Sequence, residues 1–186
     1  YRHTWNIIRL DGKYYHLDAT FDNSLGRSGS GAPEIRYDYF NLDDKAVFRD
    51  HELLIAPAPA CTDNSRFYYK EKKLSFTKTE EVYKRFLQAD KKGKTLTFHW
   101  RGGYLTREVL EELLDLMQQA GAVKNKTAVV GLNWAQAVLR LHYVESAEVG
   151  DENAEAANGA IGKGTHKAKI DVTMEDANEG EQIETD

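Results

Sequence analysis

The sequence predicts an α+β protein whose first part is built on antiparallel strands and whose second part mixes helices with strands. Three observations support this class. Asp11-Gly12 separates two runs rich in β-branched and aromatic residues, which is typical of a hairpin with a two-residue turn. Apolar residues recur at helical spacing in 79–92 and 107–120. The segment 95–100 alternates between apolar and polar residues, as a half-buried strand does.

The composition excludes several classes of protein. Of the 186 residues, 41% are hydrophobic and 30% are charged, which suits a chain with a folded core. No apolar run approaches the roughly 20 residues that cross a bilayer, so we expect no membrane span. The lysine clusters at 70–73 and 91–92 are short, so nucleic acid is not an expected partner. The single cysteine, Cys61, excludes an internal disulfide and a cysteine zinc cluster.

The first expected element is the hairpin, with strands at 4–10 and 13–20. A Gly-, Ser- and Asn-rich segment follows at 22–36 and predicts a loop. Residues 37–54 then predict a short strand, a turn and a short helix. The segment PAPAC that comes next is incompatible with regular structure, because proline lacks a donor and restricts its predecessor. We therefore expect a first domain over residues 1–61.

A small α+β module is expected over residues 62–145. Its elements are a hairpin at 65–77, helices at 79–92 and 107–120, and strands at 95–100 and 134–145. The helices are expected to start at Thr79 and Thr106 and to end at Gly93 and Gly121.

The remaining residues, 146–186, are acidic and rich in small side chains. They predict a mobile loop, one strand at about 166–174 that pairs with 134–145, and a disordered tail. Because this end is strongly negative, the rest of the chain is mildly basic although the net charge is -5.

The hairpin register places a histidine beside an aspartate. With the turn at 11–12, Leu10 faces Lys13, and the same counting puts His3 and Asp18 on one face as diagonal neighbours. Their Cα atoms would lie about 7–8 Å apart, within reach of a hydrogen bond. An aspartate that orients a histidine is half of a nucleophilic triad, although such a pair is also common on plain protein surfaces.

The sequence of residues 3–22 resembles a known family. HTWN at residues 3–6, an apolar strand, Asp-Gly, and KYYHLDATFD at 13–22 are similar to the histidine and aspartate motifs of the transglutaminase-like superfamily, especially its bacterial members. The stretch 37–54, where Tyr-Phe is followed by an Asp-His pair, resembles the family's continuation. The resemblance covers roughly residues 1–60 and weakens beyond them.

The resemblance implies a papain-like fold, in which a cysteine at a helix start packs against a sheet that carries histidine and aspartate. His3 would be the general base, Asp18 its orienter, and Trp5 a residue that shapes the site. The substrate would be a protein or peptide amide, whose acyl group passes to an amine or to water without a cofactor. We also expect an exported or cell-surface location in a bacterium.

The nucleophile of the family lies upstream of the histidine, whereas this sequence begins two residues before His3. Cys61 follows the motifs, in a segment with nothing to activate a thiol, so we expect it to be structural. The sequence is then interpreted as the C-terminal part of a longer enzyme, inactive by itself. The alternative is a non-catalytic module that binds protein or cell wall and keeps the same fold.

A metal site is a further alternative, and we do not favour it. His3, His16, Asp18 and Asp22 could be combined into one, but His16 should pair with Ile7, far along the strand from His3. Three more histidines, His99, His142 and His166, alternate with apolar residues and are expected in packing or at the surface. The acidic residues lack the spacing of a calcium loop.

Overall fold

The computed structural model describes residues 3–27, 34–54, 58–92, 94–122, 126–145 and 170–175. The chain forms two compact units. The first consists of Tyr1–Ser75, Asn133–Val138 and Met174–Asp186, and the second of Phe76–Leu132 and Leu139–Thr173. Residues 62–75, where we expected the second module to begin, therefore belong to the first unit.

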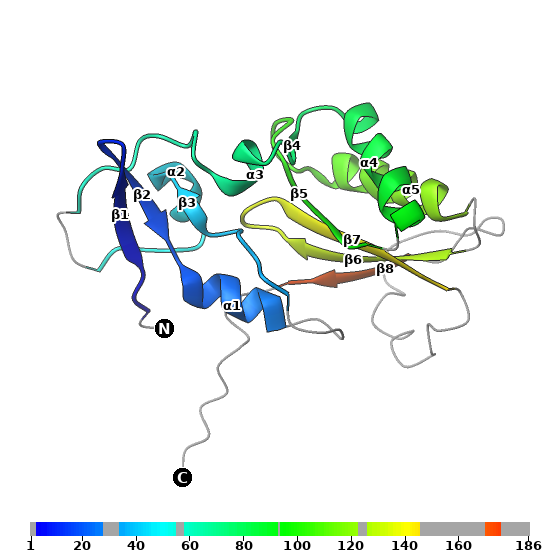
Figure 1. The fold of residues 1–186 in the computed structure, drawn as a ribbon, viewed down its shortest axis with the longest axis horizontal. Helices are drawn as coiled ribbons and strands as arrows, with labels where there is room; N and C mark the ends of the chain where they lie inside the picture. The colour runs from blue at the N-terminus through cyan, green and yellow to red at the C-terminus, as the bar shows by residue number, and fades with distance from the viewer. Residues whose placement is uncertain are drawn as a thin grey trace, which may run out of the picture. The chain divides into compact units, whose positions relative to one another are not determined.

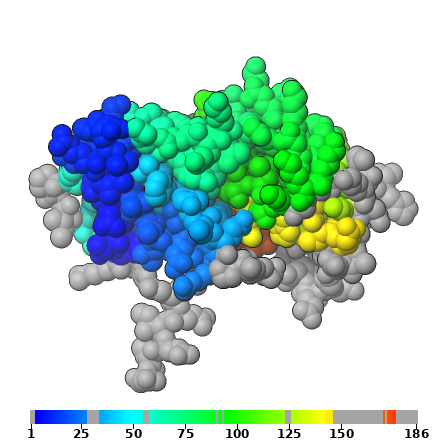
Figure 2. Space-filling view, in the orientation of Figure 1, coloured from blue at the N-terminus to red at the C-terminus, as the bar shows by residue number. Residues whose placement is uncertain are grey.

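The first unit opens with the predicted hairpin (Figure 1). Strand β1 (Asn6–Leu10) pairs antiparallel with β2 (Lys13–Leu17), and Leu10 faces Lys13 as counted from the sequence. Asp11 and Gly12 have φ angles of 50° and 82°, the left-handed values that a type I′ turn requires. The pairing and these angles confirm the predicted hairpin and its register. The turn and β1 lie at the surface (Figure 2).

The small sheet gains a third strand on the other side of β2. Strand β3 (Phe40–Leu42) pairs antiparallel with β2, and the sheet order is β1-β2-β3. A register shift falls between His16 and Leu17, which pair with Leu42 and Phe40. This irregularity affects only the β2–β3 side, so the β1–β2 register that places His3 near Asp18 is preserved.

The strand expected at 13–20 is shorter in the structure, and a helix takes the place of its last residues and of the start of the loop expected at 22–36. Strand β2 ends at Leu17, and α1 spans Ala19–Arg27. Asp18 Oδ1 accepts a hydrogen bond of 3.0 Å from the backbone N–H of Phe21, which satisfies one of the free donors of the first helical turn. Phe21 and Leu25, one helical turn apart, are both buried and stabilise α1 by about 2 kcal/mol each.

The next segments of the first unit are helical turns. Helix α2 (Asp44–Val47) is capped by Asp43, whose side chain accepts from the N–H of Ala46 at 2.8 Å. The hairpin predicted at 65–77 is wrong, because α3 (Tyr68–Glu71) occupies its first half and only β4 (Ser75–Phe76) is extended. The buried Tyr69 hydroxyl donates to Asp38, and this tertiary contact fixes the helical turn.

The core of the first unit contains a paired charge network. Arg36 donates to both carboxylate oxygens of Asp38 and to Glu175 at 2.8 Å, and all three side chains are nearly inaccessible to solvent. Asn133 donates to the same aspartate at 3.0 Å. Segments far apart in the sequence are thereby held to one unit.

The second unit is a sheet with two helices on one face (Figure 1). The strand order is β4-β5-β7-β6-β8. Its elements are α4 (Thr79–Lys92), β5 (Leu96–Trp100), α5 (Arg107–Ala122), β6 (Lys126–Asn133), β7 (Val138–Glu145) and β8 (Ile170–Met174). Both predicted helices and the strand at 95–100 are confirmed.

One strand of this unit is not expected from the sequence, and one expected strand pairing is wrong. The near-continuous apolar run of β6 lacks the alternation of a half-buried strand. It separates β7 from β8, which therefore do not pair. Gly121 is the second-last residue of α5, next to the end expected from the sequence, and a Cβ atom there would come within 2.8 Å of the Tyr143 ring. That glycine is required by packing.

The structure therefore confirms an α+β protein. No helix among the described residues is long and apolar enough to cross a membrane. Gly93, residues 146–169 and residues 176–186 fall outside the described residues, and His166 is among them. His99 and His142 are half-buried on β5 and β7.

Candidate active site

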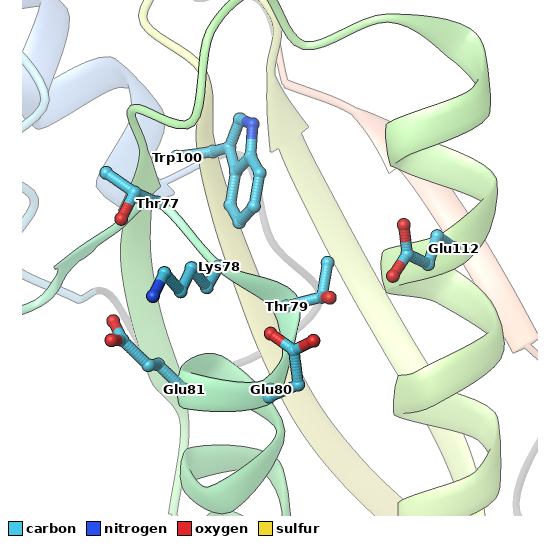
Figure 3. Close-up of a pocket in the computed structure, with 7 residues that line it drawn as sticks. All are labelled: Thr77, Lys78, Thr79, Glu80, Glu81, Trp100 and Glu112. Carbon is cyan, nitrogen blue, oxygen red and sulfur yellow. The ribbon is translucent and has the colours of Figure 1, made fainter.

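Polar side chains line a pocket of about 660 Å³ at the start of α4 in the second unit. Its lining residues are Thr77, Lys78, Thr79, Glu80, Glu81, Trp100 and Glu112. The indole nitrogen of Trp100 is buried without a hydrogen-bond partner, but it lies on the side of the ring away from Lys78 and Glu80 (Figure 3). None of the described residues directs a buried polar group into this pocket, so it is not a candidate active site.

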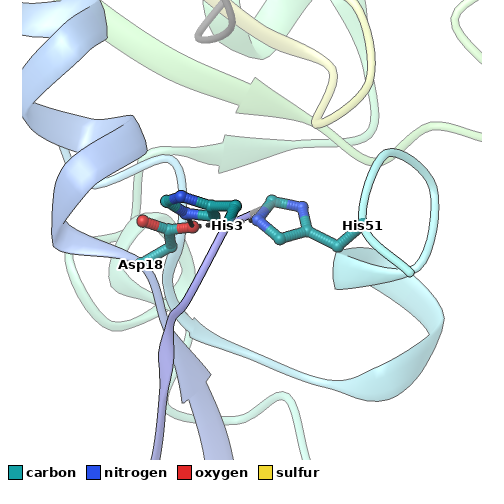
Figure 4. Close-up of side chains that lie close together, drawn as sticks. All are labelled: His3, Asp18 and His51. Atoms are coloured by element: carbon teal, nitrogen blue, oxygen red, sulfur yellow. Dashed lines mark hydrogen bonds and ion pairs between the residues drawn. The ribbon is translucent and has the colours of Figure 1, made fainter. Parts of the chain in front are cut away.

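The histidine and aspartate predicted from the sequence meet in the first unit (Figure 4). His3 Nε2 lies 2.5 Å from Asp18 Oδ2, and the two side chains are 13% and 1% exposed. His3 precedes β1, and Asp18 stands between β2 and α1, just beyond the last paired residues of the hairpin. The hairpin register therefore determines the contact, and the start of α1 fixes the carboxylate.

A second histidine, His51, completes a cluster that we call the Asp18 cluster: His3, Asp18 and His51. His51 Nε2 lies 2.9 Å from the same carboxylate oxygen, Asp18 Oδ2, and its side chain is 2% exposed. It follows α2, where its backbone N–H donates to the carbonyl of Val47 at 3.1 Å. Asp18 thus binds two histidines through Oδ2 and a backbone N–H through Oδ1.

The other ring nitrogen of His51 also faces a carboxylate. His51 Nδ1 lies 2.7 Å from Asp50 Oδ1, while Asp50 Oδ2 accepts from the Tyr39 hydroxyl at 2.5 Å. A carboxylate accepts hydrogen bonds and does not donate them, whereas a neutral imidazole has a single N–H. Both bonds are satisfied together only if both nitrogens of His51 are protonated. His51 is therefore a buried imidazolium between two carboxylates.

The ionisation of this cluster follows from these contacts. Burial by itself would lower the pKa of His51, but the hydrogen bonds to Asp18 and Asp50 outweigh it and raise the pKa to about 9. Burial would raise the pKa of Asp18, but hydrogen bonds from His51, the Phe21 N–H and His3 outweigh it and lower that pKa. At neutral pH the cluster therefore contains an ionised Asp18 and a protonated His51.

Aromatic rings enclose the imidazoles. Phe21 lies 4.6 Å from the ring centroids of both His3 and His51. Trp5, predicted to shape the site, is stacked against His3 at 6.3 Å and meets His51 edge-on at 4.9 Å. These rings reduce access of water to the His3–Asp18 bond, which strengthens its electrostatic component.

A second histidine cluster lies in the same unit. We call it the Asp44 cluster: His16, Asp44 and Cys61. His16 Nε2 lies 2.8 Å from Asp44 Oδ1, and His16 Nδ1 accepts a hydrogen bond of 3.0 Å from the indole N–H of Trp5. Since indole only donates, Nδ1 carries no proton and the single ring proton is on Nε2. His16 is therefore neutral.

Cys61 is embedded in this second cluster by its backbone. Its N–H donates to Asp44 Oδ2 at 3.0 Å, and its carbonyl accepts from the Asp44 N–H at 2.8 Å. The side chain is fully buried. Burial, with a smaller contribution from Asp44 and Asp43, raises the pKa of the Cys61 thiol to about 11. The thiol is therefore protonated and inaccessible, the opposite of an activated nucleophile.

The two clusters are also the places where the described residues bring together possible metal ligands. Within each cluster the donor atoms lie within 4.8 Å of one another. In the Asp44 cluster, the bond from Trp5 keeps the ring proton on His16 Nε2, so that nitrogen lacks a free electron pair for a metal. In the Asp18 cluster, a metal would have to displace the Nε2 protons of both histidines. Neither donor set is preformed for a metal ion.

The four-residue metal set considered from the sequence is not assembled. His3 and Asp18 meet, whereas His16 turns to Asp44, and Asp22 accepts from the backbone N–H of Tyr39 at 2.9 Å. Burial, together with the nearby Asp38 charge, raises the pKa of Asp22 to about 8. Asp22 is a structural, protonated carboxyl group.

The sequence analysis missed His51 as a member of the site. The Asp-His pair at 50–51 was noticed only as part of a motif, and its contact with Asp18 spans 33 residues. Phe21 is a further site residue that the sequence does not indicate, because it falls between the expected strand 13–20 and the expected loop 22–36, whereas the structure places it in α1. Comparisons with protein-family models, curated proteins and solved structures gave no match.

Proposed function

We propose that the first unit provides the base and the orienting carboxylate of a cysteine-dependent acyl-transfer enzyme of the transglutaminase-like superfamily, with a papain-like core. The observation that supports the proposal is the bond between His3 Nε2 and Asp18 Oδ2, in surroundings that keep Asp18 ionised. The substrate is a glutamine or peptide amide of a protein, and no cofactor takes part. An exported or cell-surface location in a bacterium belongs to the same proposal.

The first chemical step follows from the orientation of His3. Because its Nε2 donates to Asp18, Nδ1 is the nitrogen that takes the proton from the cysteine thiol. The thiolate forms a bond to the carbonyl carbon of the amide, and the electron pair of the C=O bond moves to oxygen. Asp18 stabilises the imidazolium that results and does not itself become protonated.

The second step reverses the proton movement. The carbonyl re-forms, the C–N bond breaks, and His3 gives its proton to the leaving amine or ammonia. The thioester is then attacked by an amine, which gives a cross-link, or by water, which gives the carboxylic acid. In each case His3 takes the proton of the attacking group and returns it to the sulfur.

The nucleophile is not Cys61 in this proposal. Its thiol is buried, its pKa is raised to about 11, and its backbone is bound to Asp44. Cys61 is the single cysteine of these 186 residues, so the reactive thiol comes from a part of the protein outside them. These residues alone are then expected to be inactive.

The experiment uses the full-length protein. A thiol-directed probe that mimics an amide should label one cysteine upstream of His3, and His3→Ala should reduce this labelling at least about a hundredfold, since a general base contributes that much. Cys61→Ala is the matched control and should leave labelling unchanged. Serine or alanine in place of an upstream cysteine, or equal labelling of the His3 variant, would rule the enzyme out and favour a non-catalytic binding module.

A further inference from the structure

His51 lies in the candidate site without a role in the two steps above. We propose that it is a positioning residue, a permanent cation that orients Asp18 and holds it ionised so that Asp18 can serve His3. The proposal rests on the function proposed above for its catalytic meaning, but its structural content can be tested on the 186-residue chain itself. Three observations carry it.

The first observation is that both histidines use the same acceptor atom. His3 Nε2 and His51 Nε2 lie 2.5 Å and 2.9 Å from Asp18 Oδ2, while Asp18 Oδ1 accepts from the backbone of Phe21. A carboxylate bound by a single histidine can rotate about its side-chain torsions. Three donors on two oxygens fix the plane of the carboxylate. They therefore also fix the direction of its hydrogen bond with His3.

The second observation is the support behind His51. Asp50 accepts from His51 Nδ1. Asp50 in turn accepts hydrogen bonds from the Tyr39 hydroxyl and from the side chain of Gln136, whose Nε2 lies 3.4 Å from Asp50 Oδ1. This carboxylate is 17% exposed, whereas the His51 side chain is 2% exposed. A buried imidazolium is stable only when it is paired, and Asp50 supplies a pairing that does not depend on Asp18.

The third observation concerns the burial of Asp18. A carboxylate that is 2% exposed is driven towards its neutral form, which would make it a poor partner for a protonated His3. His51 is the group that opposes this most strongly, ahead of the Phe21 N–H and of His3 itself. Among the described residues, the titratable groups that face Asp18 are thus His3 before β1 and His51 after α2, with Asp50 behind the latter.

The test follows the carboxyl carbon of Asp18 by NMR in the 186-residue chain as the pH is lowered. His51→Gln keeps a donor close to the position of Nε2 but removes the charge. We expect the midpoint of the Asp18 titration to rise by at least about one pH unit in this variant, because an opposite charge within hydrogen-bonding distance lowers a carboxyl pKa by about 1–3 units. His16→Gln is the matched control, since His16 is equally buried but bound to Asp44, and should leave the midpoint unchanged.

A second variant covers the case in which His51→Gln does not fold. Asp50→Asn keeps His51 and removes one of its two carboxylates, so the imidazole should lose its proton at a lower pH than about 9, the pKa of His51 in the native chain. An unchanged Asp18 midpoint in His51→Gln, or an unchanged His51 midpoint in Asp50→Asn, overturns the proposal. A merely structural residue would lower the melting temperature without moving either midpoint.

The catalytic meaning is tested separately in the full-length protein. His51→Gln should lower kcat and leave KM nearly unchanged, and the acid limb of the pH–rate profile should move upward with the Asp18 midpoint. A change of KM alone would contradict the positioning role. If the full-length protein has no reactive cysteine, the proposed function fails, whereas the NMR result for Asp18 and His51 stands by itself.

Discussion

The Asp18 cluster and the Asp44 cluster contain the same kinds of side chain, yet they are organised in opposite ways. Each has a buried histidine bonded to an aspartate, with His51 and His16 both 2% exposed. His51 has a carboxylate on each ring nitrogen, whereas His16 has a carboxylate on one and the Trp5 indole on the other. One imidazole is therefore a cation and the other is neutral.

This difference teaches that the partner of the second ring nitrogen decides what a buried histidine does. An acceptor there adds a proton and a charge, and a donor there removes both. The Asp18 cluster keeps its charge next to a histidine that is partly accessible to solvent, His3, at 13% exposure. The Asp44 cluster holds a fully buried, protonated thiol.

The largest expected effect concerns the thiol of the Asp44 cluster. In the native 186-residue chain at pH 8, Cys61 should react with iodoacetamide at least about a thousandfold more slowly than in urea, because its pKa is raised to about 11 and it is fully buried. Mass spectrometry of the labelled peptide measures the two rates. Rapid labelling of the native chain would show that this cluster is open and would remove the contrast.

The second effect compares the two aspartates. Asp18→Ala should lower the free energy of unfolding by about 3–5 kcal/mol, because it leaves the buried His51 cation without one of its partners. Asp44→Ala should cost less, about 1–3 kcal/mol, because this side chain is 36% exposed and the two donors that it leaves unpaired, on His16 and on the Cys61 backbone, are neutral. Urea unfolding of both variants at pH 7 gives the values. Equal losses would mean that His51 is not charged.

The third effect is a dependence of stability on pH. The pKa of His51 is raised above that of an unfolded histidine, so its stabilisation is complete below about pH 6.5 and is lost as the pH rises through about 9. The free energy of unfolding should therefore fall by up to about 3 kcal/mol between these values. His51→Gln should flatten the curve and His16→Gln should not. A curve that is already flat in the native chain would contradict the assignment of the charge.

The smallest effect tests the residue that touches both clusters. Trp5→Phe keeps an aromatic ring beside His3 and His51 but removes the N–H that binds His16 Nδ1. The free energy of unfolding should fall by about 1 kcal/mol, the usual cost of losing one hydrogen bond. Nitrogen chemical shifts of His16 should show the proton on Nε2 in the native chain and a mixture of tautomers in the variant. A mixture of both His16 tautomers in the native chain would show that Trp5 does not determine the tautomer.

Local rules accounted for the elements that the sequence predicted correctly. The Asp-Gly turn requires left-handed backbone at two adjacent positions, and this fixed the register that brings His3 to Asp18. The stripe that includes Val82 and Phe86 is fully buried in α4, as its spacing indicates. Pairing of neighbouring strands and burial of one helical face are decided within a few residues, so they can be predicted without the fold.

The elements that were missed depend on contacts that are distant in the sequence. Helix α1 occupies residues next to a sequence that favours an extended strand, and its Asp22 accepts from the backbone N–H of Tyr39, 17 residues away. The turn of α3 is held by the bond from Tyr69 to Asp38, 31 residues away. Strand β6 is buried between β7 and β8, and its position in the sheet has no signal in its own residues.

The sequence by itself determined the hairpin, its register and therefore the meeting of His3 with Asp18, because these depend on a turn and on counting along two adjacent strands. Only the tertiary structure decided the charge of the site. His51 reaches Asp18 from 33 residues away, and His16 reaches Asp44 across 28. Whether an imidazole carries one proton or two depends on the groups that face both nitrogens, and the fold alone brings those groups together.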